Sequence, residues 1–537
     1  MVFAYLHMLS NRSKPAANNF RRELYLKMRK VSGVFLSSVA IMFVLVLFGI
    51  TMPDTLEKVT SNMQAFITTH FGWYYLLVVT FFVAVCAYFL FSPVGRIRLG
   101  KQDEKPEFSR PTWVAMIFSA GVGIGLIFYG TAEPLSHYAI SSPTGITGTD
   151  QAAKDAMRYT FFHWGIHAWA IYGIVGLTVA YFTFRKGELG LISKTLRPLL
   201  GDRVDGLLGK GIDVIAVVST VIGVATTLGF GTAQINGGLT YLFGVPGSFL
   251  MQLIIVLVLT VLFLVSASTG LSKGIKILSN ANMGLTAVLF VCVLIFGPTL
   301  LIMNLFTDTL GTYVQTFVNM SFRLAPFNEQ GREWINGWTI FYWSWWIAWS
   351  PFVGIFIARV SRGRTIREFV VYVLLIPSLI GFIWFSTFGT AAISGENTGA
   401  VALSSLPLEA SLFGLLEQYP FSLALSILTI LIIITFFVTS ADSGTYVLGM
   451  MTSNGSLFPS VRIKMIWGFF LSTTALVLLY SGGLQALQNT MIIVAFPFSV
   501  VIVLMTLSLI KALNLEAKEM GIGLLKKKEA KKEVRAR

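Results

Sequence analysis

Long apolar runs recur along the whole chain, and they restrict its fold more than any other feature of the sequence. Of its 537 residues, 55% are hydrophobic and only 12% are charged, whereas soluble domains have roughly 25% charged residues. A helix needs about 20 residues to cross a hydrocarbon core of about 30 Å. We therefore predict an all-α integral membrane protein with twelve transmembrane helices. The twelve runs lie approximately at residues 34–52, 73–92, 113–131, 161–183, 211–232, 248–267, 283–303, 338–358, 368–389, 421–440, 465–481 and 488–509.

The distribution of basic residues predicts the orientation of these helices. If the helices alternate in direction, 35 of the 40 Lys and Arg residues fall on the side of the two termini. The other side keeps only Lys58, Lys154, Arg158, Arg323 and Arg332. Because Lys and Arg gather on the cytoplasmic side, we expect a plasma-membrane protein with both termini in the cytoplasm. This topology and attraction to anionic lipids account for the net charge of +15 without a nucleic-acid partner.

The third run, "SAGVGIGLIFYG", carries glycines that weaken its helix. Gly121, Gly123 and Gly125 alternate at its centre, and each costs about 1 kcal/mol in helix propensity. A nucleotide-binding loop is excluded, because the GxGxxG spacing fails and no strand precedes it. Two interpretations remain open. One is close helix packing through the GxxxG pair of Gly121 and Gly125, and the other is an unwound turn whose amides and carbonyls face an anion and a cation.

Two later segments predict further interruptions. Pro351, past the middle of the eighth run, lacks a backbone donor and frees a carbonyl one turn earlier. In the tenth run, the largely apolar stretch from Phe421 to Met451 is too long for one straight crossing, and "FFVTSADSGTYVLG" within it predicts an interruption. The hydroxyls of Thr439 and Ser440 either suit a small monovalent cation or bond back to their own helix. Asp442 is expected as a cap or gate residue near the cytoplasmic end.

The broken third and eighth helices suggest two inverted five-helix repeats. Interrupted helices in corresponding positions of such repeats indicate a binding site between them. We therefore expect a basic cytoplasmic N-terminus, two peripheral helices, the first repeat, an external amphipathic linker, the second repeat and a basic cytoplasmic tail. These segments comprise residues 1–33, 34–110, 111–303, 304–337, 338–510 and 511–537.

Aromatic side chains gather in the eighth run, which contains "FYWSWWIAWSPFVG". Trp343 fits an interfacial belt. Three further tryptophans fall nearer the membrane midplane: Trp345, Trp346 and Trp349. The fourth run adds three more aromatics: Trp164, Trp169 and Tyr172. These rings either pack against each other or wall a cavity, and indole faces favour a poorly hydrated cation such as a quaternary ammonium group.

Few other residues suggest a catalytic or metal-binding role. His163 and His167 lie at i, i+4, but without a third ligand we expect hydrogen bonding rather than metal binding. Cys86 and Cys292 predict neither a disulfide framework nor a metal site. The apolar runs contain no Ser/His/Asp set and no paired carboxylates, so we do not expect an enzyme. A channel is a remote alternative, because the runs offer no polar pore.

Several segments together resemble the betaine/carnitine/choline transporter family. They are "WSWWIAWSPFVGIFIARVSRGRTIREF", "AGVGIGLIFYGTAEPL", "FFVTSADSGTY" and the triplet of Trp164, Trp169 and Tyr172. The resemblance covers essentially the whole chain. It implies the inverted five-plus-five fold of the leucine-type sodium symporters, two extra N-terminal helices and a homotrimer. It also implies transport of a trimethylammonium compound or a related solute, such as glycine betaine, choline, carnitine or ectoine.

The resemblance further implies roles for individual residues. The substrate cage corresponds to Trp164, Trp169, Tyr172 and Trp346, with Trp345 and Trp349 along the pathway and Gly121, Gly123 and Gly125 beside it. One sodium site corresponds to the carbonyls of Ser119, Val122 and Phe436 and the hydroxyls of Thr439 and Ser440. A second corresponds to Thr220 and Phe352, but the further threonine of the family appears as Val224, or is displaced to Thr226 or Thr227. Sodium is the coupling ion, and no other cofactor is implied.

Two differences within the family narrow the expected substrate and coupling. Exchangers that work without sodium carry a basic residue in the fifth helix, and residues 212–234 contain no Lys or Arg. Choline carriers tend to place Asp at the position of Gly125, so a zwitterion is favoured here. We expect osmoprotective import of glycine betaine or a similar solute by sodium symport. The alternative is a choline or carnitine carrier or exchanger coupled to protons or independent of sodium. The tail "LLKKKEAKKEVRAR" is expected to be a solvated basic segment or a sensor of salt and anionic lipid.

Overall fold

The computed structural model describes residues 32–121, 123–269, 272–399 and 401–522. Within these ranges the chain is helical, and the only extended pairing is an isolated antiparallel bridge between Arg98 and Thr365. The all-α prediction is therefore confirmed for the described part of the chain. Nearly all of the predicted N-terminal segment, most of the basic tail and Val122 lie outside the described residues.

The helices follow one another with short connections. The α-helices are α3 (Gly33–Thr51), α4 (Pro53–Phe91), α5 (Arg110–Gly121), α6 (Ile124–Leu135), α7 (Asp150–Trp164), α8 (Ile166–Ala180), α9 (Arg197–Leu200), α10 (Leu207–Phe243), α11 (Phe249–Thr269), α12 (Ser272–Phe296), α13 (Thr299–Ser321), α14 (Glu329–Trp334), α15 (Phe341–Val360), α16 (Ile366–Thr398), α17 (Ser411–Glu417), α18 (Ser422–Thr452) and α19 (Val461–Glu519). Three π-helical segments extend them: η2 (Ser136–Ile140), η3 (Tyr181–Arg185) and η6 (Ile335–Ile340). Five 3-10 turns complete the set: η1 (Pro93–Arg96), η4 (Ser193–Leu196), η5 (Gly201–Asp205), η7 (Leu403–Ser405) and η8 (Leu408–Ala410).

Ten helical segments of the described chain are long and apolar enough to cross a membrane, which makes this a multi-span membrane protein. The structure has ten such segments where the sequence predicts twelve runs, for two reasons. α19 contains the last two runs, with non-helical backbone between them at Gly482 (φ −172°, ψ 23°) and Gly483 (φ 61°, ψ −141°). The third run is divided between α5 and α6, which have 12 residues each and are too short to cross the bilayer singly.

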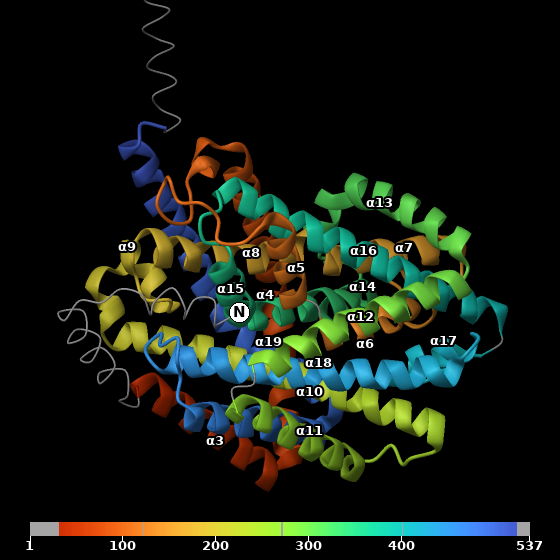
Figure 1. The fold of residues 1–537 in the computed structure, drawn as a ribbon. Coiled ribbons are helices and arrows are strands. Elements are labelled where there is room, and N and C mark those ends of the chain that lie inside the picture. Colours follow the sequence, from red (N-terminus) through yellow and green to blue (C-terminus); the bar gives the residue numbers. More distant parts are fainter. Residues whose placement is uncertain (1–31, 122, 270–271, 400, 523–537) are drawn as a thin grey trace, which may run out of the picture.

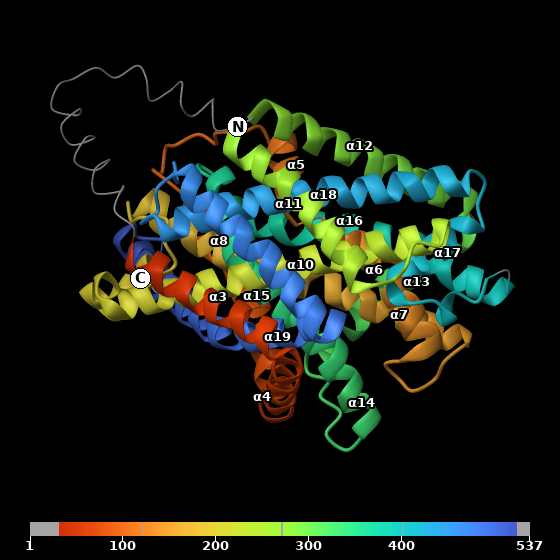
Figure 2. The same ribbon diagram turned by 90° about the horizontal axis from the view of Figure 1, so that it is seen from below.

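α8 and α15 form the centre of the molecule, and nearly all of their residues are buried. α10, α16 and α19 pack around this pair. Toward the outside, α11 and α12 lie beside α18, and α13 lies beside α7 and α16 (Figure 1). The second view shows α3 alongside α19 (Figure 2). The outer helices α3, α11 and α12 expose many Leu, Ile, Val and Phe side chains, as expected for surfaces that face lipid.

The predicted end of the seventh run is wrong. α12 ends at Phe296, and a new helix, α13, begins at Thr299. Gly297 and Pro298 separate them, because proline lacks a backbone donor and disfavours helical geometry in the residue before it. α13 therefore occupies the first half of the segment predicted as an external linker.

The interruption predicted from the glycines of the third run is confirmed. α5 ends at Gly121, α6 begins at Ile124, and Gly123 between them has extended angles (φ −165°, ψ −158°). A Cβ atom at Gly123 would meet nothing within 4 Å, whereas one at Gly125 would lie 2.6 Å from Cη2 of Trp345. The glycine stretch thus combines both interpretations, an open turn at Gly123 and close packing at Gly125.

The other two predicted interruptions are absent. α15 continues through Pro351, and the hydroxyl of Ser350 donates to the Ile347 carbonyl that the proline leaves free (2.7 Å). α18 is continuous across Thr439, whose hydroxyl bonds to the Thr435 carbonyl one turn back (2.8 Å). In α15 the Ser350 hydroxyl thus replaces the donor that Pro351 lacks, and in α18 the Thr439 hydroxyl is accommodated within a continuous helix.

A break that the sequence did not predict divides the fourth run at Gly165. This residue separates α7 from α8 and has φ −94° and ψ −144°. A Cβ atom there would lie 2.5 Å from the Phe161 carbonyl oxygen and 2.7 Å from Cζ of Phe382. Because the neighbouring α16 approaches so closely, only glycine fits without displacement.

Candidate functional site

Four aromatic side chains from α7, α8 and α15 meet at Trp346, and we call them the aromatic cage: Trp164, Trp169, Tyr172 and Trp346. The ring centroid of Trp346 lies 5.7 Å from that of Trp164, 5.7 Å from that of Trp169 and 4.7 Å from that of Tyr172. All four side chains are buried. Trp164 reaches the cage from the end of α7, and Trp169 and Tyr172 reach it from α8 beyond the break at Gly165.

The space between these rings is small. A cavity of about 10 Å³ lies between Trp164, Trp169 and Trp346, which is roughly the room of one water molecule. Tyr172 packs on Trp346 but does not line this cavity. The walls of the cavity comprise Phe118, Leu126, Trp164, Trp169, Trp346, Pro377 and Gly381. The rings must therefore move apart before a trimethylammonium group can enter. Phe118, Leu126, Pro377 and Gly381 were not predicted as site residues, and no signal in the sequence distinguishes them from other apolar helix positions.

Trp345 and Trp349 are anchored to α10. The indole nitrogen of Trp345 donates to the Thr227 hydroxyl oxygen (3.2 Å), and that of Trp349 donates to the same oxygen (3.0 Å) and to the Gly223 carbonyl (2.8 Å). Because two donors already occupy the Thr227 oxygen, this residue has little capacity left to bind a cation. The location of these two tryptophans along a permeation pathway stays a prediction.

Trp343 does not belong to an interfacial belt, contrary to the interpretation from sequence. Its side chain is only 1% exposed, and its ring stacks on that of His167 with 5.7 Å between centroids. The two histidines of the fourth run hydrogen bond to different partners, as His167 contacts Ser321 (2.8 Å) and His163 contacts Glu133 (2.7 Å). They therefore do not form a shared pair.

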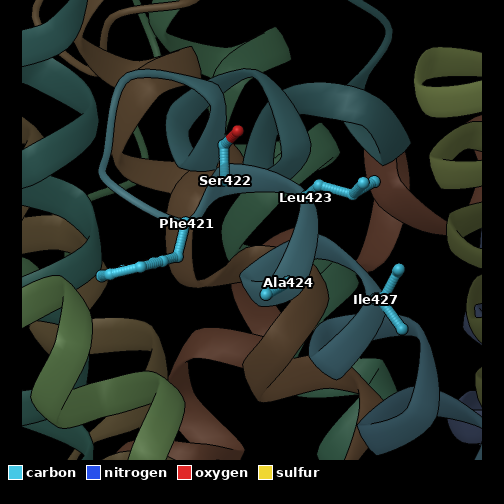
Figure 3. Close-up of a pocket in the computed structure, with 5 residues that line it drawn as sticks. All are labelled: Phe421, Ser422, Leu423, Ala424 and Ile427. Atoms are coloured by element: carbon cyan, nitrogen blue, oxygen red, sulfur yellow. The ribbon is translucent and has the colours of Figure 1, made fainter.

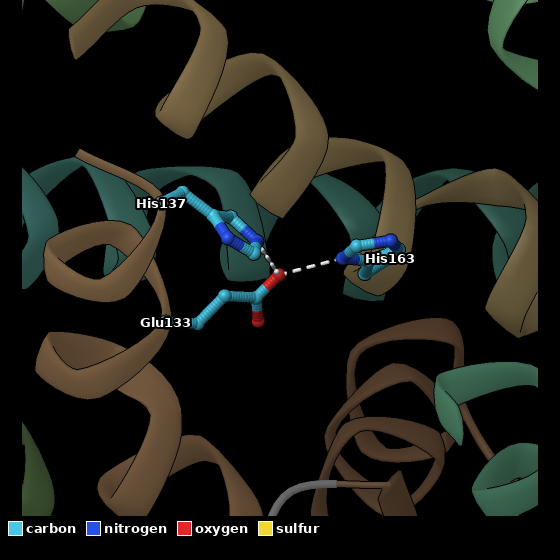
Figure 4. Close-up of side chains that lie close together, drawn as sticks. All are labelled: Glu133, His137 and His163. Carbon is cyan, nitrogen blue, oxygen red and sulfur yellow. Dashed lines mark hydrogen bonds and ion pairs between the residues drawn. The ribbon is translucent and has the colours of Figure 1, made fainter. Parts of the chain in front are cut away.

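The carboxylate of Glu133, on α6, lies directly behind the cage. It is fully buried, and its Oε1 atom lies 2.7 Å from Nδ1 of His163 and 3.4 Å from Nε2 of His137 (Figure 4). Its other oxygen accepts hydrogen bonds from the indole nitrogen of Trp164 (2.7 Å) and from the hydroxyl of Tyr342. These contacts satisfy a group that is costly to bury alone. The sequence did not predict this cluster, although an acidic residue at the end of an apolar run was a usable signal.

The structure places the predicted sodium ligands only in part. Val122 lies outside the described residues, and the side chain of Ser119 is not described. The hydroxyls of Thr439 and Thr220 donate to the carbonyls of Thr435 and Ala216, each at 2.8 Å. A hydroxyl that donates its proton in this way keeps lone pairs for a cation, so these two residues suit such a role.

The remaining predicted cation residues lie on α10, α15 and α18. Phe352 and Phe436 are buried, and Ser440 is partly buried. Val224, which replaces the second threonine of the family, is buried and offers no side-chain oxygen. The hydroxyl of Thr226 contacts the Leu487 carbonyl at 3.5 Å. The second sodium site therefore has fewer candidate ligands than the first.

A larger hollow, of about 430 Å³, lies at the N-terminal end of α18 (Figure 3). It is lined by Phe421, Ser422, Leu423, Ala424 and Ile427. Phe421 and Leu423 are exposed, and only Ser422 carries a polar side chain. A surface of this kind offers nothing that would recognise a charged solute, so the cage remains the candidate site.

Comparisons with known proteins identify the family to which this chain belongs. The family model for the betaine/carnitine/choline family transporters matches residues 33–518. The chain is 59% identical over 493 residues to the glycine betaine transporter OpuD of Bacillus subtilis, covering 92% of this chain and 96% of the relative. It is 44% identical over 485 residues to an ectoine/hydroxyectoine transporter of Virgibacillus pantothenticus, covering 90% and 96%. It is 40% identical over 491 residues to a glycine betaine transporter of Acinetobacter baylyi, covering 91% and 74%. The chain therefore belongs to the betaine/carnitine/choline family of transporters.

Proposed function

We propose that this protein is a secondary active transporter that imports glycine betaine by sodium symport and so serves osmoprotection. The observation that carries the proposal is the convergence of Trp164, Trp169 and Tyr172 on Trp346. Indole and phenol faces attract a cation whose charge is spread over methyl groups, with about 0.5 to 2 kcal/mol for each ring. The relatives from Bacillus and Acinetobacter, which carry the name glycine betaine transporter, support the same substrate.

The zwitterionic nature of glycine betaine also matches the break in the third run. Its carboxylate requires donors, and the turn at Gly123 leaves the first amides of α6 without helical partners. The positive end of the helix dipole favours an anion at the same place. We infer that the ammonium group binds in the cage and that the carboxylate faces the glycine turn.

The cage must open before it can hold the solute, because the present cavity has the size of one water molecule. The break at Gly123 precedes α6, and the break at Gly165 lies between Trp164 and Trp169 of the cage; both are places where a helix can pivot. We infer that α6 and α7 move relative to α8 and α15 during alternating access.

We propose twelve membrane crossings in the inverted five-plus-five arrangement, with two extra helices at the N-terminus. α5 and α6 together would make one crossing, and α19 would make two, on either side of Gly482 and Gly483. The distribution of basic residues supports a cytoplasmic location of both termini and contact with anionic lipids. Assembly as a homotrimer follows from the family resemblance.

For the coupling ion, a first sodium would be held by the hydroxyls of Thr439 and Ser440 with the carbonyls of Ser119, Val122 and Phe436. A second would be held near Thr220 and Phe352. Sodium prefers uncharged oxygen ligands, and the two described threonine hydroxyls that donate to their own helices keep such oxygens available. Because sodium and the solute bind together, the inward sodium gradient drives uptake of the solute.

The proposal is tested by uptake of radiolabelled glycine betaine into proteoliposomes that contain the purified protein. We expect saturable uptake that an inward sodium gradient drives and that replacement of sodium by potassium abolishes. Unlabelled ectoine, choline and carnitine are tested as competitors. Undiminished uptake in potassium would overturn sodium coupling. Absence of saturable betaine uptake, with uptake of another of these solutes, would overturn the substrate assignment.

A further inference from the structure

The contacts of Glu133 indicate that its carboxylate is ionised. The indole nitrogen of Trp164 can only donate, so Oε2 of Glu133 must accept from it. The hydroxyl of Tyr342 contacts the same oxygen. A carboxylate that accepts several hydrogen bonds is stabilised in its charged form.

The two histidines also present protons to this carboxylate. Nδ1 of His137 lies 3.4 Å from the indole nitrogen of Trp334, which can only donate. In a neutral ring, the proton of His137 therefore lies on Nε2, the atom that faces Glu133. For His163, Nδ1 also faces the carboxylate, and Nε2 lies 3.0 Å from the Thr339 hydroxyl, which can either donate or accept.

This pattern argues against a metal centre, although Glu133, His137 and His163 have suitable ligand types and close spacing. A metal ion needs the lone pairs of Nε2 of His137 and Nδ1 of His163. Because Trp334 donates to Nδ1 of His137, a neutral His137 carries its proton on Nε2 and offers no lone pair there. The cluster is instead a carboxylate with three hydrogen-bonding partners, Trp164, Tyr342 and His163, and with His137 farther away at 3.4 Å.

The charge of Glu133 is not neutralised by Lys or Arg. Among the residues that the structure describes, its ion-pair partners are only His137 and His163. A buried negative charge therefore lies one hydrogen bond from the cage. In a medium of low dielectric constant, such a charge acts over several ångströms.

The hydrogen bond connects this charge to the ring that faces the substrate. An anionic acceptor on the indole N–H draws the proton toward itself and raises the electron density of the ring. A more negative ring face attracts a quaternary ammonium group more strongly. The same bond holds the Trp164 ring in the orientation in which it contacts Trp346.

The position of Glu133 on α6 also matches the polarity of a zwitterion. The free amides lie at the start of α6, and Glu133 lies nine residues after Ile124, about 14 Å along the helix axis. The start of the helix favours a carboxylate, and the region of Glu133 favours a cation. Both effects orient the solute in the same direction.

We propose that Glu133 is a positioning and specificity residue, whose carboxylate fixes the indole of Trp164 and strengthens its attraction for the quaternary ammonium group of the substrate. This inference rests on the proposed function, because it assumes that the cage binds such a group. It predicts that Glu133 affects substrate affinity rather than turnover, and that it does so through Trp164.

The test is a double-mutant cycle of Glu133→Gln and Trp164→Phe, with KM and Vmax measured from betaine uptake in proteoliposomes. Phe keeps an aromatic ring but removes the N–H that bonds to Glu133. In the wild-type background, we expect Glu133→Gln to raise KM about 3- to 10-fold, with Vmax changed less than about twofold. In the Trp164→Phe background, the same substitution should change KM less than about twofold.

Two results would overturn the inference. One is an equal rise of KM in both backgrounds, which would mean that Glu133 does not act through Trp164. The other is a lower Vmax at unchanged KM, which would assign Glu133 to helix movement or stability. If Glu133→Gln does not reach the membrane, Glu133→Asp takes its place, since its shorter carboxylate retreats from the indole. A raised KM is then expected, and an unchanged KM contradicts the inference. Absence of betaine uptake by the wild-type protein would instead refute the proposed function.

Discussion

Replacement of Trp346 by Leu is the most direct test of the cage. Trp346 is the ring on which the other three cage residues converge, with centroid distances of 5.7, 5.7 and 4.7 Å. Leu removes the π-face but leaves an apolar side chain in the same place. Loss of one cation–π contact of about 0.5 to 2 kcal/mol corresponds to a rise in KM of about 2- to 30-fold. Trp346→Phe, which keeps a smaller ring, should give an intermediate value.

The matched control is Trp343→Leu. Trp343 lies on the same helix and is equally buried, but it stacks on His167 and does not line the cavity. Both substitutions remove similar volume from the protein interior, so both should destabilise the protein. Only Trp346→Leu should raise KM, whereas Trp343→Leu should leave KM within about twofold of the wild-type value.

The assay is the initial rate of labelled glycine betaine uptake at varied substrate concentration, with protein content per liposome equalised. Thermal unfolding of the detergent-solubilised variants reports the loss of stability separately. The cage hypothesis is refuted if Trp346→Leu leaves KM unchanged. It is also refuted if Trp343→Leu raises KM by the same factor, since the effect would then come from packing in general.

Two further predictions concern the pair α5 and α6, which is interrupted at the glycines, and α15, which continues through Pro351. Gly125→Ala should place a methyl group 2.6 Å from Trp345 and reduce uptake and thermal stability, with an overpacking cost of about 1 to 3 kcal/mol. Gly123→Ala, whose new methyl group meets nothing within 4 Å, should retain thermal stability, and an equal loss of stability in the two variants would contradict the packing argument. Ser350→Ala should lower the melting temperature, because the carbonyl left free by Pro351 loses its donor, at a cost of about 1 to 3 kcal/mol. Adding Pro351→Ala should restore stability by supplying a backbone N–H, and a lack of restoration would show that this bond is not the cause.

The fold class followed from the sequence because membrane insertion imposes local rules. Apolar runs of about 20 residues must be helical, since lipid offers no partners for the backbone. The glycine-rich break was also predictable, because Gly121, Gly123 and Gly125 weaken a helix wherever it packs. The break at Gly165 was not, because a single glycine in an apolar run is common. Glycine is required at this position because Phe382, on a distant helix, approaches too closely for a Cβ atom.

The prediction of interruptions at Pro351 and near Thr439 was wrong for a related reason. Proline and hydroxyl residues weaken a helix on average, but the outcome depends on where each hydroxyl bonds. The Ser350 hydroxyl donates to the carbonyl that Pro351 leaves without a backbone donor. The Thr439 hydroxyl bonds to a carbonyl of its own helix. Trp343 was misplaced because its position near a helix end says little about which side of the helix faces lipid.

The sequence by itself determined that this chain is a helical membrane protein of the betaine/carnitine/choline type. It also determined which aromatic residues could wall a cage. Both follow from hydropathy, charge and motifs, which are properties of short stretches of sequence. Only the tertiary structure decided that Trp164, Trp169 and Tyr172 converge on Trp346 and that Trp345 and Trp349 are held by Thr227. It alone placed the buried carboxylate of Glu133 behind the cage. These contacts join helices that are far apart in the chain, and their existence depends on which helix faces pack together, a property that no local pattern records.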